Sequence, residues 1–185
     1  MNCELCKIAI IGPESSGKST LARYLANRYG GILVPEYART FVEQLMIERQ
    51  TDDWTRVLTY DDLCSLAKHQ IEELTSLNSA ALNRPQAAKQ QAPLALNDDT
   101  VVFFDTELIV TKVWFDYAFG SVPEWLNEAI SRYPMDVYLL TYPDLPWIPD
   151  PARSNGSDTV RKELFDRYEA EIQALDIPYY IIRHQ

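Results

Sequence analysis

The sequence is poor in the residues that build metal and redox sites. It contains three cysteines and two histidines among 185 residues. Cys3 and Cys6 are separated by two residues, but no second cysteine or histidine pair follows at the spacing of a zinc site. We therefore expect neither a zinc site nor a redox centre, and we expect both histidines to be structural.

An excess of positive charge is also missing. Lysine and arginine together number 17 against 27 aspartates and glutamates, which gives a formal net charge of −10. Because nucleic acids and anionic membranes attract clustered positive charge, neither is an expected partner. No apolar stretch approaches the length of a membrane span, and the N-terminus lacks the pattern of a signal peptide. These absences favour a cytoplasmic protein.

The length and the apolar content predict one domain, residues 1–185. With 46% hydrophobic residues the chain can bury one substantial core, and it is too short for two ordinary domains. Apolar runs alternate with amphipathic helical patterns, which is typical of a three-layer α/β sandwich with a five-stranded parallel sheet. We interpret the Ala/Gln/Asn/Pro-rich segment 83–99 as a mobile surface loop. The five predicted strands cover residues 8–11, 32–34, 101–105, 136–141 and 179–182.

One short motif organises the chain. The first apolar run ends at Gly12, and Gly12, Gly17, Lys18 and Ser19 then follow the G-x-x-x-x-G-K-S spacing of a P-loop. The glycines allow backbone N–H groups to point at phosphate oxygens, and the helix that follows adds its positive end. Lys18 would reach the β- and γ-phosphates of ATP, and the Ser19 hydroxyl would hold Mg2+. The predicted ATP-binding residues are consecutive: Gly12, Pro13, Glu14, Ser15, Ser16, Gly17, Lys18, Ser19 and Thr20.

Carboxylates stand at the ends of two predicted strands. Asp105 closes an apolar strand as a Walker B aspartate does, and it is the second predicted ligand of Mg2+. Ligands of open α/β sheets bind at the carboxyl ends of the strands, so Glu36, Tyr37 and Arg39 are predicted to face the phosphate acceptor. A charged helix start is the alternative for these three residues. Glu14 lies inside an anion cradle, and we expect its side chain to point away from the phosphates.

A proline-rich segment before the last helix is interpreted as a lid. It contains Trp147 and Arg153, and Arg161 follows near the start of the helix. A lid of this kind excludes water and places positive charge beside a migrating phosphoryl group. A solvated loop with incidental arginines remains the alternative.

Four motifs in fixed order carry a resemblance to a known family. They are GPESSGKST, PEYAR at 35–39, FFDTELIVTKVW at 103–114 and WIPDPAR at 147–153. With these motifs the chain resembles the kinase domain of NadR-type proteins over nearly its whole length, residues 1–6 and 83–99 excepted. The resemblance implies a ribosylnicotinamide kinase, which phosphorylates the 5′-hydroxyl of nicotinamide riboside with ATP to give nicotinamide mononucleotide. Bifunctional family members carry a nucleotidyltransferase domain ahead of the kinase domain, and we expect only the kinase activity here.

The resemblance and the chemistry of phosphoryl transfer together suggest roles for individual residues. Lys18 and the P-loop would hold ATP, and Asp105 would serve Mg2+ with the P-loop serine. Arg153 and Arg161 would steady the migrating phosphoryl group, and Glu36 is the predicted base at the substrate hydroxyl. These are the predicted catalytic residues.

The acceptor would be a small nucleoside with a cationic pyridinium ring. Aromatic faces attract such a ring, so Trp114, Tyr117 and Trp147 are candidates for binding it, although Trp114 has an equal chance of being a core residue. Glu107 replaces the second Asp of the family's D-T-D pattern, and no role is assigned to it.

Two other functions remain open at this stage. One is a P-loop kinase for a different nucleoside or nucleotide, and the other is a non-enzymatic ATP-binding regulatory module. Release of ADP on addition of candidate nucleosides distinguishes them, because a regulatory module would not respond.

Overall fold

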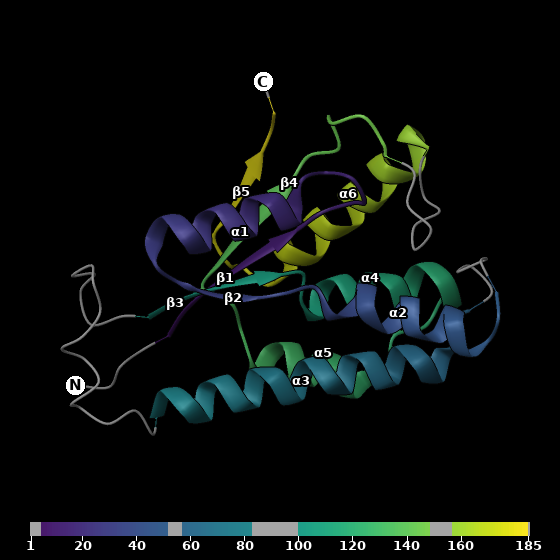
Figure 1. Ribbon diagram of the computed structural model, residues 1–185, viewed down its shortest axis with the longest axis horizontal. Coiled ribbons are helices and arrows are strands. Elements are labelled where there is room, and N and C mark those ends of the chain that lie inside the picture. The colour runs from purple at the N-terminus through teal and green to yellow at the C-terminus, as the bar shows by residue number, and fades with distance from the viewer. Residues whose placement is uncertain (1–4, 52–56, 83–99, 149–156, 185) are drawn as a thin grey trace.

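The computed structural model describes residues 5–51, 57–82, 100–148 and 157–184 of the protein. At its centre lies a parallel sheet of five strands in the order β2-β3-β1-β4-β5, which confirms the predicted sheet (Figure 1). Segment 83–99 and Arg153 lie outside the described residues. The strands are β1 (Leu5–Ile11), β2 (Ile32–Val34), β3 (Thr100–Asp105), β4 (Val137–Thr141) and β5 (Tyr179–Ile182).

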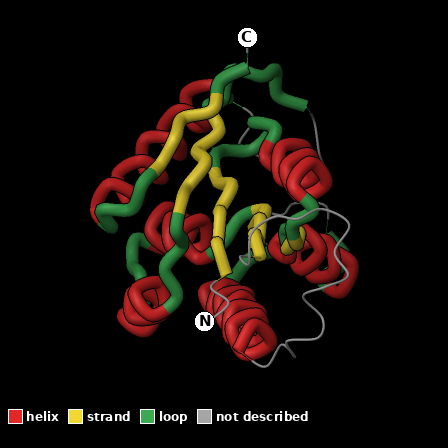
Figure 2. The backbone as a smooth tube through the Cα atoms, turned by 90° about the vertical axis from the view of Figure 1, so that its left-hand side faces the viewer, coloured by secondary structure: helices red, strands yellow, loops and turns green. Residues whose placement is uncertain are grey.

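Helices cover both faces of the sheet, as the view in Figure 2 shows. Helix α1 packs on one face, where its buried Ala22 and Ala26 join Ile10 and Phe103 in a small core. Residues of α3, α4, α5 and α6 form the larger core on the other face. Among the described residues no helix is long and apolar enough to cross a membrane. The helices are α1 (Lys18–Tyr29), α2 (Tyr37–Glu48), α3 (Tyr60–Leu82), α4 (Leu108–Phe119), α5 (Glu124–Arg132) and α6 (Asp158–Ala174).

Thr59 and Asp62 cap the start of α3. Thr59 N donates to Asp62 Oδ2 at 2.8 Å, and Asp62 N donates to Thr59 Oγ1 at 3.2 Å. These reciprocal hydrogen bonds satisfy amide groups that a helix start would otherwise leave unpaired.

Two local features differ from what the apolar pattern alone indicates. The apolar run 32–34 is typical of a buried parallel strand, but β2 is an edge strand and Ile32 is 40% exposed. The pattern after β3 indicates a helix from Thr106, but α4 begins at Leu108, because the extended Glu107 caps the helix and Thr106 has a φ of 69°. This left-handed residue turns the chain sharply where β3 ends.

Neighbouring parallel strands bring their carboxyl ends to one edge of the sheet. The P-loop follows β1, Glu36 follows β2, and Asp105 closes β3, with β3 paired to both β1 and β2. Segments 12–17, 36–39 and 105–107 therefore meet at this edge, which is the usual ligand position in open α/β folds.

Candidate active site

The P-loop backbone adopts conformations that require glycine at two positions. Gly12 has a φ of 145°, and a Cβ atom there would lie 2.3 Å from Thr141 Oγ1 and 2.6 Å from Thr141 O. Gly17, with a φ of 85°, precedes α1 and lies against the imidazole of His184, whose Nε2 would be 3.1 Å from an added Cβ. Side chains at either position would force the loop apart, so the motif glycines fix its shape.

Buried hydrogen bonds hold this loop to the end of β4. Ser16 Oγ donates to Pro13 O at 2.7 Å and lies 2.6 Å from Thr141 Oγ1. Thr141 Oγ1 donates to Ile11 O at 3.2 Å. Lys18 Nζ donates to Pro13 O at 2.8 Å, so the lysine lies over the loop that it is predicted to serve. The network positions the loop between β1 and β4.

A cavity of about 430 Å³ opens over the P-loop. We call it the P-loop pocket. The P-loop, the start of α1 and part of the segment after β4 line it. Its lining residues are Ser15, Ser16, Gly17, Lys18, Ser19, Thr20, Arg39, Leu145, Pro146 and Ile148.

Asp105 and Ser19 fit a magnesium site. Phe103 packs with α1, and side chains alternate along a strand, so Asp105 also faces the side of the sheet on which Ser19 begins that helix. Asp105 is 6% exposed, and its Oδ1 has no hydrogen-bond partner among the described residues. Mg2+ typically takes one or two protein carboxylates together with phosphate oxygens and water.

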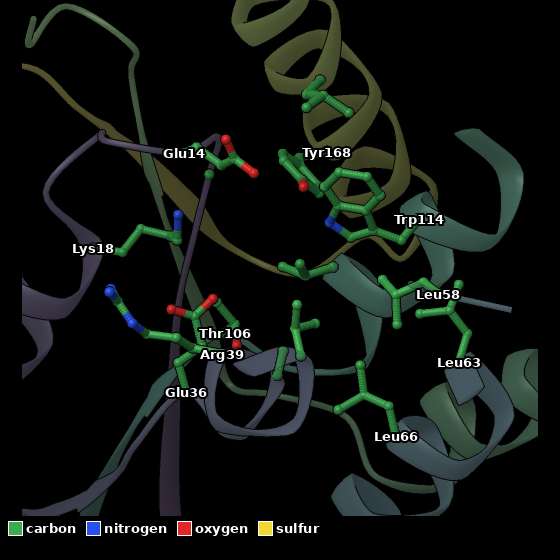
Figure 3. A pocket seen from close by; sticks show the side chains of 15 residues that line it. Glu14, Lys18, Glu36, Arg39, Leu58, Leu63, Leu66, Thr106, Trp114 and Tyr168 are labelled. Carbon is green, nitrogen blue, oxygen red and sulfur yellow. The ribbon is translucent and has the colours of Figure 1, made fainter. Parts of the chain in front are cut away.

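A second, smaller cavity, of about 90 Å³, adjoins the first. We call it the Trp114 pocket. Figure 3 shows Glu36, Arg39 and Lys18 at one end and Trp114 with Tyr168 at the other, while leucines of the α3 region line the wall. The lining residues are Gly12, Glu14, Lys18, Glu36, Ala38, Arg39, Val42, Leu58, Leu63, Leu66, Thr106, Val110, Trp114, Leu164 and Tyr168.

Charged residues of both signs line the Trp114 pocket: the carboxylates Glu14 and Glu36 and the cations Lys18 and Arg39. Figure 3 shows the Glu14 carboxylate on the Tyr168 side of the P-loop. Burial raises the pKa of Tyr168, and the negative charges of Glu14 and Glu36 raise it further, while a hydrogen bond with Trp114 acts in the opposite direction. Tyr168 therefore keeps its hydroxyl proton, and on this side the pocket combines a carboxylate with aromatic surface.

Sequence reasoning missed two residues of this constellation. Tyr168 was expected only as part of the apolar face of the last helix, and Thr141 only as the end of a strand. No local motif marks either residue, because each comes beside the P-loop through tertiary packing of α6 or β4.

Three predicted substrate residues do not line the Trp114 pocket. The ring of Tyr37 stacks on His69 with centroids 3.7 Å apart, and Tyr117 meets Trp114 edge to face at 5.8 Å. Trp147 is partly buried beside the P-loop pocket, and its Nε1 has no partner among the described residues. The first two side chains pack on other aromatic rings in this structure, and their contact with the substrate stays a prediction.

Arg161 occupies a different position from the one expected of a lid arginine. It is 1% exposed, and it donates to Glu14 O at 3.1 Å, Ser15 O at 3.3 Å and Leu145 O at 2.9 Å. These carbonyls belong to the P-loop and to the segment after β4. Arg161 therefore ties α6 to the back of the cradle, and contact with a phosphoryl group would require these bonds to break.

A parallel sheet in this order, with a glycine-bounded cradle after β1 and an acidic strand end beside it, defines a P-loop fold of the kind found in nucleoside and nucleotide kinases. The family model described as an AAA domain matches residues 7–185, so the chain belongs to this family.

Individual relatives agree with the resemblance to NadR-type proteins. The chain is 28% identical over 156 residues to the trifunctional NAD biosynthesis/regulator protein NadR of Escherichia coli K12, covering 84% of this chain and 33% of the relative. It thus spans about a third of that protein.

Solved structures show the same fold. A structure of NadR in complex with NR matches with a TM-score of 0.65 and 23% identity, covering 96% of this chain and 43% of the other. Thymidylate kinase from Ehrlichia chaffeensis matches with a TM-score of 0.59 and 15% identity, covering 97% and 87% of the two chains. The predicted resemblance to NadR-type proteins is confirmed.

Proposed function

We propose that this protein is a ribosylnicotinamide kinase, which uses ATP and Mg2+ to phosphorylate nicotinamide riboside. The observation that carries the proposal is the Trp114 pocket, which places the Glu14 carboxylate on the side of an aromatic pair and opens beside Lys18. The pyridinium ring of the riboside is cationic, so the charge of Glu14 attracts it. A desolvated contact with the face of Trp114 adds on the order of 1–2 kcal/mol. The similarity to NadR supports this choice of acceptor.

The proposed reaction transfers one phosphoryl group. The 5′-oxygen of the riboside forms a bond to the γ-phosphorus, the bond from that phosphorus to the β–γ bridging oxygen breaks, and ADP leaves. Glu36 accepts the hydroxyl proton, and Lys18 holds the β- and γ-phosphates in the cradle. Ser19 and Asp105 would hold Mg2+, which neutralises charge on the phosphates.

The direct test is product analysis. Purified protein with ATP, Mg2+ and nicotinamide riboside should release ADP and yield nicotinamide mononucleotide, identified by mass spectrometry. Lys18→Ala should lose this activity and remain folded, because the Lys18 ammonium bonds to the backbone of the loop. Absence of the mononucleotide with folded wild-type protein would reject the proposal.

A nucleoside panel in the same assay tests the alternative of another P-loop kinase. The apolar wall formed by leucines of the Trp114 pocket also suits an uncharged base, and the thymidylate kinase fold is shared. Phosphorylation of a purine or pyrimidine nucleoside, or of thymidylate, in place of the riboside would establish that reading. ATP binding without acceptor-dependent ADP release would identify a regulatory module.

A further inference from the structure

Two cationic side chains connect the P-loop pocket with the Trp114 pocket. Among the described residues, Lys18 and Arg39 line both cavities and no other residue does. If ATP occupies one cavity and the acceptor hydroxyl the other, the migrating phosphoryl group must pass this junction. Lys18 has a role as the P-loop lysine. Arg39 so far has none in the transfer.

The position of Arg39 follows from the start of α2. Glu36 is the N-cap of this helix, and Arg39 lies within its first turn. Figure 3 shows the guanidinium of Arg39 beside the Glu36 carboxylate and on the same side of the pocket as Lys18. The proposed base, Glu36, therefore lies on the same side of the pocket as the positive charges of Lys18 and Arg39.

The ion pair between Arg39 and Glu43 is exposed and does not hold the guanidinium strongly. Its Nε donates to Glu43 at 3.0 Å, and the two side chains are 45% and 49% exposed. An exposed ion pair of this kind contributes at most about 1 kcal/mol. A phosphate oxygen offers the guanidinium a stronger, bidentate partner.

Two arginines of α6 are committed elsewhere. Arg161 is buried and donates to backbone carbonyls behind the P-loop. Arg167 pairs with Asp116 and Glu163 and lies over the ring of Tyr117. Neither lines the P-loop pocket or the Trp114 pocket. Arg39 is better placed than either to meet a group that moves between the cavities.

We propose that Arg39 is a catalytic residue of the phosphoryl transfer, and this proposal rests on the proposed kinase function. Its guanidinium donates hydrogen bonds to the oxygens of the γ-phosphoryl group as that group leaves ADP and bonds to the acceptor oxygen. Because the interaction is strongest in the transition state, it raises kcat more than it strengthens ATP binding.

The kinetic test compares four variants at saturating nicotinamide riboside. Arg39→Gln should lower kcat by roughly 10²–10³ while the KM for ATP changes only a few-fold. Arg39→Lys keeps the charge but not the planar fork, and should retain part of the rate. Arg23→Gln is the control of equal charge change on exposed α1, and Glu43→Gln removes the ion-pair partner; both should stay within about twofold of wild type. Circular dichroism verifies folding.

A binding experiment tests the catalytic role of Arg39 in the absence of the acceptor nucleoside. Aluminium fluoride mimics the migrating phosphoryl group, so Mg·ADP should bind wild-type protein more tightly in its presence. Arg39→Gln should abolish this gain and leave ADP affinity unchanged, while Arg23→Gln should preserve the gain.

The outcomes separate the two proposals. Wild-type protein that leaves nicotinamide riboside unchanged rejects the proposed substrate, and the fluoroaluminate experiment still decides the role of Arg39. An Arg39→Gln variant that keeps the fluoroaluminate gain, or that loses affinity for ADP and its fluoroaluminate complex equally, overturns the catalytic role.

Discussion

At the scale of single residues, Glu36 and Asp105 are chemically similar carboxylates whose positions suit different roles. They follow neighbouring strands, β2 and β3, at the same edge of the sheet. Asp105 is almost fully buried on the α1 face, whereas Glu36 is half-buried and lines the Trp114 pocket. The first position suits a metal ligand beside Ser19, and the second suits a base near the acceptor hydroxyl.

Mutants of these two carboxylates should fail in different ways. Glu36→Gln keeps the size of the side chain but cannot take a proton, so kcat should fall by roughly 10²–10⁴ with the Mg2+ requirement unchanged. Asp105→Asn should raise the Mg2+ concentration needed for half-maximal rate, because a neutral amide is a poorer ligand. Mg2+ titrations of initial rate check both expectations. A shifted requirement in Glu36→Gln with a normal one in Asp105→Asn would reverse the assignment.

Residues that belong to contiguous motifs could be predicted, and residues brought in by folding could not. The P-loop glycines and Lys18 are recognisable because their spacing is local, and the structure brings them together as a cradle. Tyr168 meets Glu14 across a long stretch of sequence, and its periodicity is that of any core residue. The carbonyl partners of Arg161 likewise depend on how α6 packs against the P-loop, which no spacing reveals.

At the scale of elements, the boundary between β3 and α4 shows the limit of pattern reading. The apolar strand 101–105 was predicted within one residue, because continuous apolar runs mark a buried parallel strand. The helix start was not, because Thr106 and Glu107 are compatible with a helix by propensity. Glu107 instead caps α4, and its Oε1 accepts from Ile109 N at 2.9 Å.

This buried cap predicts a pH-dependent stability. Burial raises the pKa of Glu107 to about 8, although the N–H groups of Ile109 and Leu108 act to lower it. In the unfolded chain the carboxyl has its ordinary pKa of 4.5, so the folded state binds an extra proton between these two pH values. The free energy of unfolding should therefore fall as the pH rises through this window, and the contribution is fully lost above about pH 8.

Glu107→Gln should remove most of this dependence, because the amide stays neutral and keeps an acceptor oxygen for the cap. Urea unfolding at pH 5.5 and pH 8.5 should show the variant gaining roughly 2 kcal/mol or more over wild type on going to the higher pH. Glu128→Gln on exposed α5 serves as the control and should follow wild type. Equal pH slopes for wild type and Glu107→Gln would show that Glu107 ionises normally in the folded protein.

At the scale of the whole molecule, the charge balance and the site chemistry agree. A net charge of −10 repels polyanions, yet the P-loop supplies Lys18 and a helix start locally for phosphate. On the acceptor side, Glu14 adds a local negative charge near Trp114 and Tyr168. A cationic acceptor would therefore be attracted over a distance and also held at close range, whereas a neutral one would gain from packing alone.

The dependence of the rate on salt separates electrostatic attraction of the acceptor from packing. With ATP saturating, kcat/KM for nicotinamide riboside should fall several-fold as ionic strength rises from about 0.02 M to about 0.3 M, because screening shortens the reach of the negative field. The dihydro form of the riboside has a neutral ring of nearly the same shape, so its kcat/KM should change much less. Glu14→Gln should flatten the salt dependence of the cationic riboside and leave that of the neutral form unaltered. Parallel salt dependence of the two ribosides would show that acceptor charge is not recognised, and the pocket would then select its substrate by shape and apolar contact.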